Sequence, residues 1–188
     1  MGFLDCSWKM QFFRCIAILI ILSCSPSRLE SQTFEMVTQL PSEIHESSGL
    51  VAISDSLFIT HNDGGNDPVL YVVNRSGDIV SKVHLRGGGN IDWEDLAVMG
   101  DGSVLVGEFG NNAQTRRNLA LLKLPPFQTW SSDTIDVVRI PFIFGDQAEF
   151  PPPNTNKNFD CEALACVGDS VFLFSKNWSE PFDGYTKM

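Results

Sequence analysis

Carboxylate side chains recur in one motif of the sequence, D-x-E-x-L-A. The motif occurs at Asp92–Ala97 and again at Asp160–Ala165. Carboxylate oxygens are hard ligands that suit calcium or another divalent cation, which takes about six to eight oxygens. The candidate metal ligands are therefore Asp92, Glu94, Asp160 and Glu162. The alternative is that each carboxylate caps backbone N–H groups of a neighbouring loop, and repetition at equivalent positions favours this second interpretation.

Three polar loops follow short apolar runs and supply further groups for binding. The candidate ligand-binding residues are His61, Asn62, Asp63, Asn111, Asn112, Arg116, Lys176 and Asn177. Glu108 and Asp63 are the candidate catalytic residues of a hydrolase, because water activated by a metal ion also needs a base within hydrogen-bond reach. The sequence contains no GxSxG, HExxH or GxxxxGK[ST] pattern, and the spacing of its three histidines does not suit a zinc site.

The elements that must position these groups form a repeat. In each copy a Leu is followed five residues later by an Asp in a turn, at Leu50 and Asp55, Leu96 and Asp101, and Leu164 and Asp169. Short runs of Val, Ile, Leu and Phe between the turns predict strands, and no later segment has a sustained helical period. The predicted strands are 50–53, 57–60, 69–73 and 79–85 in the first copy, and 96–99, 104–107, 119–124 and 135–142 in the second.

This order of strands predicts an all-β fold, a β-propeller of four-stranded antiparallel blades. The third copy starts at Asp160, so residues 46–188 are expected to form about two and a half blades, a fragment of a ring that needs at least about four. Residues 25–45 form an N-terminal segment in which Phe34–Ile44 is expected to be a closing strand. A β-sandwich is the alternative, and the equal register of the repeats favours the propeller.

In such a blade, the loop between the second and third strands lies at the same end as the entry to the first strand. The polar loops and the D-x-E-x-L-A motifs are therefore expected to form one acidic, Asn-rich face. We expect this face to bind a ligand, with a divalent cation as the candidate cofactor. The alternatives are a metal-dependent hydrolase of a lactone or phosphoester and a structural propeller that binds proteins. The expected partners are a small molecule, a saccharide or a protein.

The first 24 residues predict export from the cytosol. Lys9 and Arg14 precede an apolar run, Cys15–Leu22, that is too short to span a bilayer and is typical of a signal peptide. A lipoprotein signal with a lipid anchor at Cys24 is the second interpretation and the sole expected link to a membrane. We therefore expect a secreted, periplasmic or cell-envelope protein. The formal net charge of −10 makes nucleic acid a poor partner.

Two cysteines, Cys161 and Cys166, remain after the predicted signal peptide. An oxidising compartment favours disulfides in general. If both residues lie on one extended strand, steps of about 3.3 Å place their α-carbons roughly 16 Å apart, which is beyond disulfide reach. We therefore expect two separate thiols rather than a bridge.

Four motifs carry a resemblance to known proteins. HNDGG, DWEDLA, GEFGNN with Arg116, and DCEALA occur in this order between about Glu46 and Met188. On these motifs the chain resembles secreted bacterial β-propeller proteins of unassigned activity, which are similar to six-bladed gluconolactonase-like and NHL-type propellers. The resemblance to gluconolactonases implies one divalent ion at the mouth of the central channel, held by an acid of the first blade and by an Asn and an Asp of later blades. Glu46 loosely matches the first ligand, and the blades that would carry the others are not in this sequence.

Overall fold

The structure is a computed structural model that describes residues 34–188. The predicted signal peptide, residues 1–24, and the candidate lipid anchor Cys24 lie outside the described residues. Within 34–188, no helix has the length and apolar character needed to cross a membrane. Residues 36–188 are all-β, as predicted, with two short 3-10 helices, Phe127–Thr129 and Asn154–Asn156, between strands.

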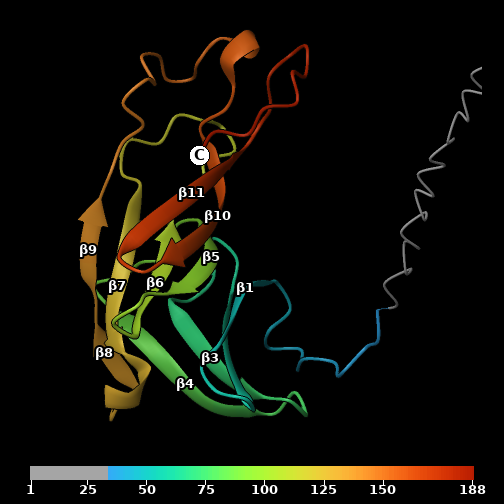
Figure 1. The fold of residues 1–188 in the computed structure, drawn as a ribbon, viewed down its shortest axis with the longest axis vertical. Coiled ribbons are helices and arrows are strands. Elements are labelled where there is room, and N and C mark those ends of the chain that lie inside the picture. Colours follow the sequence, from blue (N-terminus) through green and yellow to red (C-terminus); the bar gives the residue numbers. More distant parts are fainter. Residues whose placement is uncertain (1–33) are drawn as a thin grey trace, which may run out of the picture. The chain divides into compact units, whose positions relative to one another are not determined.

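The strands form three sheets (Figure 1). The first sheet has the order β1 (Ser47–Ala52), β2 (Leu57–Asn62), β3 (Val69–Asn74), β4 (Ile79–Arg86) and β8 (Thr134–Asp136). The second has the order β5 (Trp93–Val98), β6 (Ser103–Glu108), β7 (Ala120–Pro126) and β9 (Val138–Pro141). The third pairs β10 (Asp160–Val167) with β11 (Ser170–Lys176). Within the first two sheets, consecutive strands pair antiparallel from β1 to β4 and from β5 to β7.

The last strand predicted for the second copy, 135–142, is wrong as a single element. The chain forms two strands there, because β8 pairs in parallel with β4 of the first sheet whereas β9 pairs antiparallel with β7 of the second. Ile135 is buried in the apolar core between these two sheets, which places β8 beside β4. Arg86 and Asp136 also form a two-pronged ion pair across the parallel strands, at 2.5 and 2.6 Å. The segment therefore connects the edges of two sheets.

The first strand of each sheet carries a register shift one or two residues before the Leu of the repeat. The shift lies between Ser48 and Leu50 in β1, between Trp93 and Leu96 in β5, and between Cys161 and Ala163 in β10. Such an irregularity redirects side chains beside it and is common next to functional sites. In β5 and β10 it lies at the glutamates of the D-x-E-x-L-A motifs.

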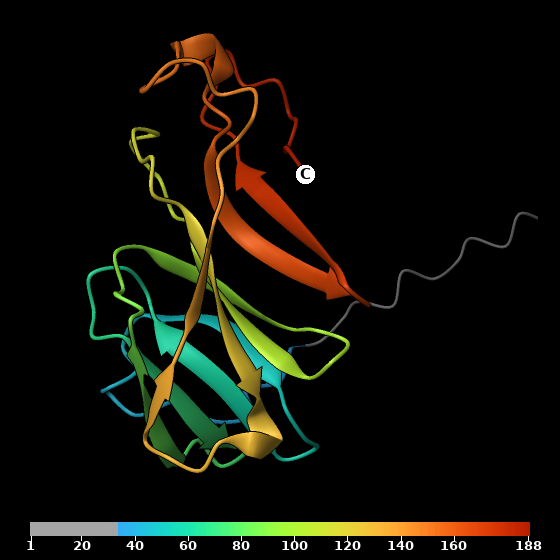
Figure 2. The same ribbon diagram turned by 90° about the vertical axis from the view of Figure 1, so that its left-hand side faces the viewer.

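The sheets pack on one another through two apolar cores (Figure 2). The first core joins Ile59, Leu70 and Val83 of the first sheet to Leu96, Val106 and Leu122 of the second. The second core joins Leu105 and Leu121 of the second sheet to Cys161 and Leu164 of the third. All residues of β6 are buried as a result. A strand covered on both faces needs apolar side chains on both, which explains its continuous Val and Leu run.

The N-terminal segment packs on the outer face of the first sheet. Leu40 and Ile44 contact the cluster formed by Val69, Tyr71 and Val73 of β3. Residues 36–45 form no strand, so a closing role for the segment 25–45 stays a prediction. At the other end of the described chain, both cysteines lie on β10 as unpaired thiols, as expected from their spacing.

Candidate metal centre

Three carboxylates meet where the loop after β2 approaches the start of β5. Asp63 directly follows β2, Asp92 precedes β5, and Glu94 is the second residue of β5. One oxygen from each of these side chains lies within 4.8 Å of the other two. We call this group the carboxylate cluster. It unites two of the four predicted metal ligands with a residue that the sequence placed among the catalytic and ligand-binding candidates.

The backbone around the carboxylate cluster is fixed by hydrogen bonds of the Asn90 side chain and of the backbone N–H groups of Gly64 and Gly110. The amide of Asn90 donates to Asp63 O at 2.8 Å, and its oxygen accepts from Trp93 N at 3.1 Å. Asp63 itself accepts from the N–H of Gly64 at 2.6 Å. Gly110 N donates to Asp92 O at 3.0 Å and thereby brings in the loop after β6. These bonds hold the two loops and the start of β5 together before any ion is considered.

Two glycines leave room for the carboxylates. A Cβ atom on Gly64 would lie 2.5 Å from Asp92 Oδ1, and one on Gly110 would overlap Glu94 Oε1 and the Asp92 carboxylate. Van der Waals contact needs much larger separations, so a side chain at either position would displace the acids. The glycines of HNDGG and GEFGNN therefore have a steric role that their sequence motifs alone do not reveal.

The carboxylate cluster carries more negative charge than the nearby cations balance. Among residues 34–188, Arg116 Nη1 lies 4.0 Å from Asp92, and no Lys, Arg or His nitrogen lies within that distance of Asp63 or Glu94. Burial, followed by repulsion from Glu162, Asp63, Asp92 and Asp160, raises the pKa of Glu94 to about 9. Burial also raises the pKa of Asp92, against the attraction of Arg116. A divalent cation would relieve both effects.

Asp160 and Glu162, the other predicted metal ligands, have protein partners instead. Asp160 is fully buried and accepts from Asn111 N and from Trp178 Nε1, both at 2.7 Å. Glu162 pairs with Lys176 at 3.1 Å. Asp160 therefore shows the capping geometry that was the alternative interpretation of the motif, and neither residue belongs to the carboxylate cluster.

Glu108 and Arg116 form a buried ion pair beneath the loop after β6. Arg116 Nη2 donates to Glu108 Oε1 at 2.5 Å, and Glu108 Oε2 accepts from Ile91 N at 3.1 Å. Arg116 also donates to Gly110 O at 2.6 Å. Both oxygens of the candidate base Glu108 are thus occupied, and its side chain is 0% exposed. This geometry holds the loop against β5.

The remaining candidates of the predicted face divide between the interior and the surface. Asn111 accepts from Arg116 N at 2.9 Å and donates to Phe159 O at 3.1 Å. Asn62 bonds the backbone of Glu43 and Glu46, and Asn177 bonds Asp183 and Tyr185 in its own loop. Asn112 is exposed. These amides organise the backbone of the face, which is the role that loops without regular partners require.

Two residues named from the sequence, His61 and Glu46, lie outside the carboxylate cluster, and a third, Asn90, was not predicted. His61 is buried against the edge of Trp93 and donates from Nδ1 to Asn62 O at 2.8 Å, which leaves its Nε2 without a partner among the described residues. Burial lowers the pKa of His61. Glu46, which loosely matched a gluconolactonase ligand, accepts from Asn66 at 2.7 Å and lies outside the carboxylate cluster. Asn90 was missed because its role depends on a contact with the preceding repeat.

Comparisons with known proteins give no relative whose site could be set beside this geometry. No protein-family model matches the chain, and neither the curated proteins nor the solved structures give a match. The functional argument therefore starts from the carboxylate cluster itself.

Proposed function

We propose that the three sheets are consecutive blades of a β-propeller whose acidic end binds a divalent cation, calcium in the first place, and through it an oxygen-rich ligand. The protein ligands of the ion are Asp63, Asp92 and Glu94. The observation that carries the proposal is the approach of these three oxygens, which come from two separate segments of the chain, to within 4.8 Å of one another.

The arrangement of first strands supports a propeller. β1 lies against β5, and β5 lies against β10. Ser48 Oγ donates to Glu94 O at 2.5 Å, and Leu164 N donates to Asp95 Oδ2 at 2.8 Å, so each first strand is bonded to the next. First strands surround the central channel in a propeller, whereas the two apolar cores correspond to contacts between blades.

The chemistry of the carboxylate cluster suits calcium better than a transition metal. All of its side-chain ligands are carboxylates, which are hard oxygen donors. Calcium takes about six to eight oxygens, so three carboxylates leave positions for main-chain oxygens, water and an external ligand. Extracellular modules bind calcium with dissociation constants of about 0.1–1 mM, which agrees with the predicted secreted, periplasmic or cell-envelope location.

Binding is better supported than hydrolysis. A hydrolase needs an ion with an open position and a separate base near the attacking water. Glu108 has both oxygens engaged by Arg116 and Ile91, and Asp63 is itself one of the three proposed ligands. The expected external ligand is a saccharide or a protein carboxylate, which can complete the coordination of the ion without being cleaved.

A calcium titration tests the proposal. About 1 mM calcium should raise the free energy of unfolding by about 1.4 kcal/mol for a dissociation constant near 0.1 mM, because the ion binds the native state. Asp63→Asn and Glu94→Gln should each remove most of this gain, since each keeps the shape and deletes a charged ligand. The comparison variant is Glu162→Gln, which removes a charge that repels Glu94 but none of the three proposed ligands, and should keep the response.

The proposal fails if calcium, magnesium and manganese leave the thermal unfolding of the wild-type chain unchanged up to about 10 mM. If Glu162→Gln loses the response and Asp63→Asn keeps it, the ion binds at the third sheet instead. A calcium response that survives all three substitutions would place the ion elsewhere in the molecule.

A further inference from the structure

One position of the repeat is buried in two sheets and exposed in the third. Leu96 in β5 and Leu164 in β10 are 3% and 6% exposed, because each packs against the sheet that precedes its own along the chain. Leu50 holds the same position in β1 and is 62% exposed. The side of the first sheet that carries Leu50 is therefore built as a contact between sheets, and residues 34–188 contain no preceding sheet to cover it.

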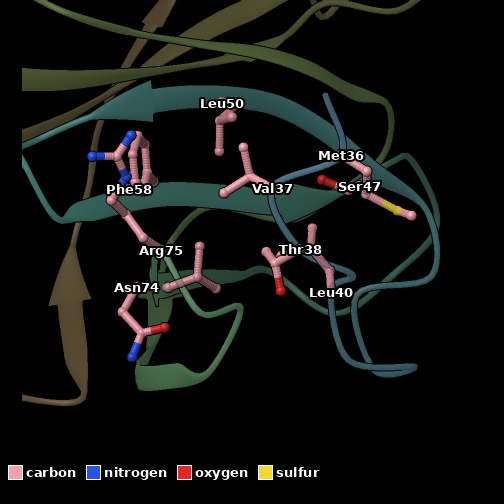
Figure 3. Close-up of a pocket in the computed structure, with 10 residues that line it drawn as sticks. Met36, Val37, Thr38, Leu40, Ser47, Leu50, Phe58, Asn74 and Arg75 are labelled. Atoms are coloured by element: carbon pink, nitrogen blue, oxygen red, sulfur yellow. The ribbon is translucent and has the colours of Figure 1, made fainter. Parts of the chain in front are cut away.

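This side of the first sheet, which we call the Leu50 face, is hollowed by a groove of about 370 Å³ (Figure 3). Leu50 of β1, Phe58 of β2 and Val37 of the N-terminal segment line the groove. Leu40 and Ile44 of the same segment pack on the part of the face that β3 forms. The segment therefore covers the outer part of the face and leaves Leu50 in water.

The third sheet has an open side of the opposite kind. Val171 and Leu173 of β11 pack on the second sheet. Successive side chains of a strand point to opposite faces, so Phe172 points away from the second sheet. Phe172 is half-buried, and Ala165, which pairs with it in β10, is exposed.

The residues equivalent to Phe172 show what this position contacts. Ile59 in β2, Leu105 in β6 and Phe172 in β11 each pair with the residue that follows the Leu of their own repeat. Ile59 and Leu105 are 0% and 1% exposed, and each shares an apolar core with the repeat Leu of the following sheet. The Phe172 position of one sheet thus packs on the Leu50 position of the next.

We propose that two copies of this chain bind head to tail, with the third sheet of each copy on the Leu50 face of the other. The inference rests on the proposed propeller, and it names the source of the blades that complete the ring. Two copies of three sheets supply six, within the range of about four to eight blades in closed propellers. A contact between different surfaces closes into a ring when the rotation between copies returns to its start.

The two surfaces also match in extent. The third sheet has two strands, β10 and β11, and it meets the part of the Leu50 face that the N-terminal segment leaves open. The groove of about 370 Å³ is larger than the roughly 150 Å³ that holds a benzene ring, so it has room for the Phe172 side chain. Removal of Leu50 and Phe172 from water drives the association.

Sedimentation velocity tests the ring of two copies. Wild type should sediment as a dimer at about 100 µM and dissociate on dilution toward about 1 µM. Leu50→Glu and Phe172→Glu should each leave only monomer at about 100 µM, because each places a charge in both contacts of the ring. The matched control is Val138→Glu, which alters a 64% exposed residue of β9 in the second sheet and should keep the dimer. Circular dichroism checks that each variant folds, and Ala165→Glu, on the same face, replaces Phe172→Glu if that variant does not.

Three outcomes overturn the proposal. A wild-type monomer at about 100 µM means that no second copy covers the Leu50 face. A dimer that Leu50→Glu dissociates and Phe172→Glu leaves intact uses a symmetric contact between two first sheets. Masses that grow beyond the dimer show an open head-to-tail chain. The calcium titration is scored separately, since a monomer that responds to calcium refutes only the ring of two copies, and a dimer without a response refutes only the cation site.

Discussion

The starts of β5 and β10 carry the same motif and use it differently. At the start of β10, Asp160 is buried and accepts two hydrogen bonds, while Glu162 pairs with a lysine. At the start of β5, Asp92 and Glu94 meet a third carboxylate, Asp63, and the one cation within 4.0 Å among the described residues is Arg116, beside Asp92. One motif thus forms a capped, neutralised site in one place and a crowded anionic site in the other.

The difference comes from the loops that each motif meets. Asp160 faces the backbone N–H of Asn111 and the indole of Trp178, which are donors. Asp92 faces Gly64 and Gly110, which offer no side chain, and Asp63, which adds charge. A carboxylate with donors around it is structural, whereas one among other carboxylates is available to a cation. The neighbouring loop therefore determines the role of the motif.

The largest expected effect is on the buried pair that supports the β5 site. Arg116→Met should lower the free energy of unfolding by about 3–5 kcal/mol, because it leaves the charge of Glu108 buried without a partner. The side chains of Arg116 and Glu108 are 14% and 0% exposed. Urea denaturation measures the loss. The double variant Arg116→Met with Glu108→Gln should recover part of it, and a loss below about 1 kcal/mol would show that the pair is dispensable.

The next effect compares the two aspartates directly. Asp160→Ala should cost about 3 kcal/mol, because it leaves the buried N–H of Asn111 and the indole N–H of Trp178 without an acceptor. Asp92→Ala should cost less than about 1 kcal/mol in EDTA, since it also removes repulsion from the carboxylate cluster. Parallel urea unfolding curves measure both values. Equal losses in the two variants would contradict the division into a capped site and a crowded site.

A pH titration sharpens the same comparison at Glu94. Its pKa is raised in the folded state to about 9 from an ordinary value of 4.5, so the native state holds a proton that the unfolded state has released within this range. In EDTA, Glu94 therefore costs no folding stability below about pH 4.5, where it is protonated in both states. The free energy of unfolding falls as the pH rises from there toward 9, because the folded state must keep the proton or ionise a buried carboxylate. Glu94→Gln should unfold at a higher temperature than wild type at pH 8.5. A matching pH dependence of the melting temperature in both proteins would show that Glu94 ionises freely.

Local sequence patterns predicted most of the strands because strand composition depends on short-range chemistry. The runs at β2, β3 and β6 have the β-branched and apolar composition that packed sheets require. The polar loops also approach the D-x-E-x-L-A motifs as expected, through Asn111 and Asp160 and through Gly110 and Asp92.

The remaining features depend on contacts between repeats, which the sequence does not encode locally. Residues 135–142 have the composition of one strand, and only the pairing of β8 with β4 and of β9 with β7 divides them between two sheets. Asp63 joins Asp92 because Asn90 connects their loops, and Glu108 is buried because Arg116 turns back toward it. The D-x-E-x-L-A motif predicted four carboxylate ligands. The groups that each of them contacts depend on neighbouring loops, which the motif does not include.

The smallest expected effect is at the lysine of the β10 site. Lys176 pairs with Glu162 at 3.1 Å and lies 4.5 Å from the centre of the Trp178 ring. Both charged side chains are partly exposed, at 47% and 31%, so solvent and salt screen their attraction. Lys176→Met should therefore cost about 0.5 kcal/mol or less in low salt, because methionine keeps an apolar contact with the indole. The cost should disappear in about 0.5 M sodium chloride. A loss above about 1.5 kcal/mol that persists in salt would mean that the third sheet, like the second, depends on a desolvated ion pair.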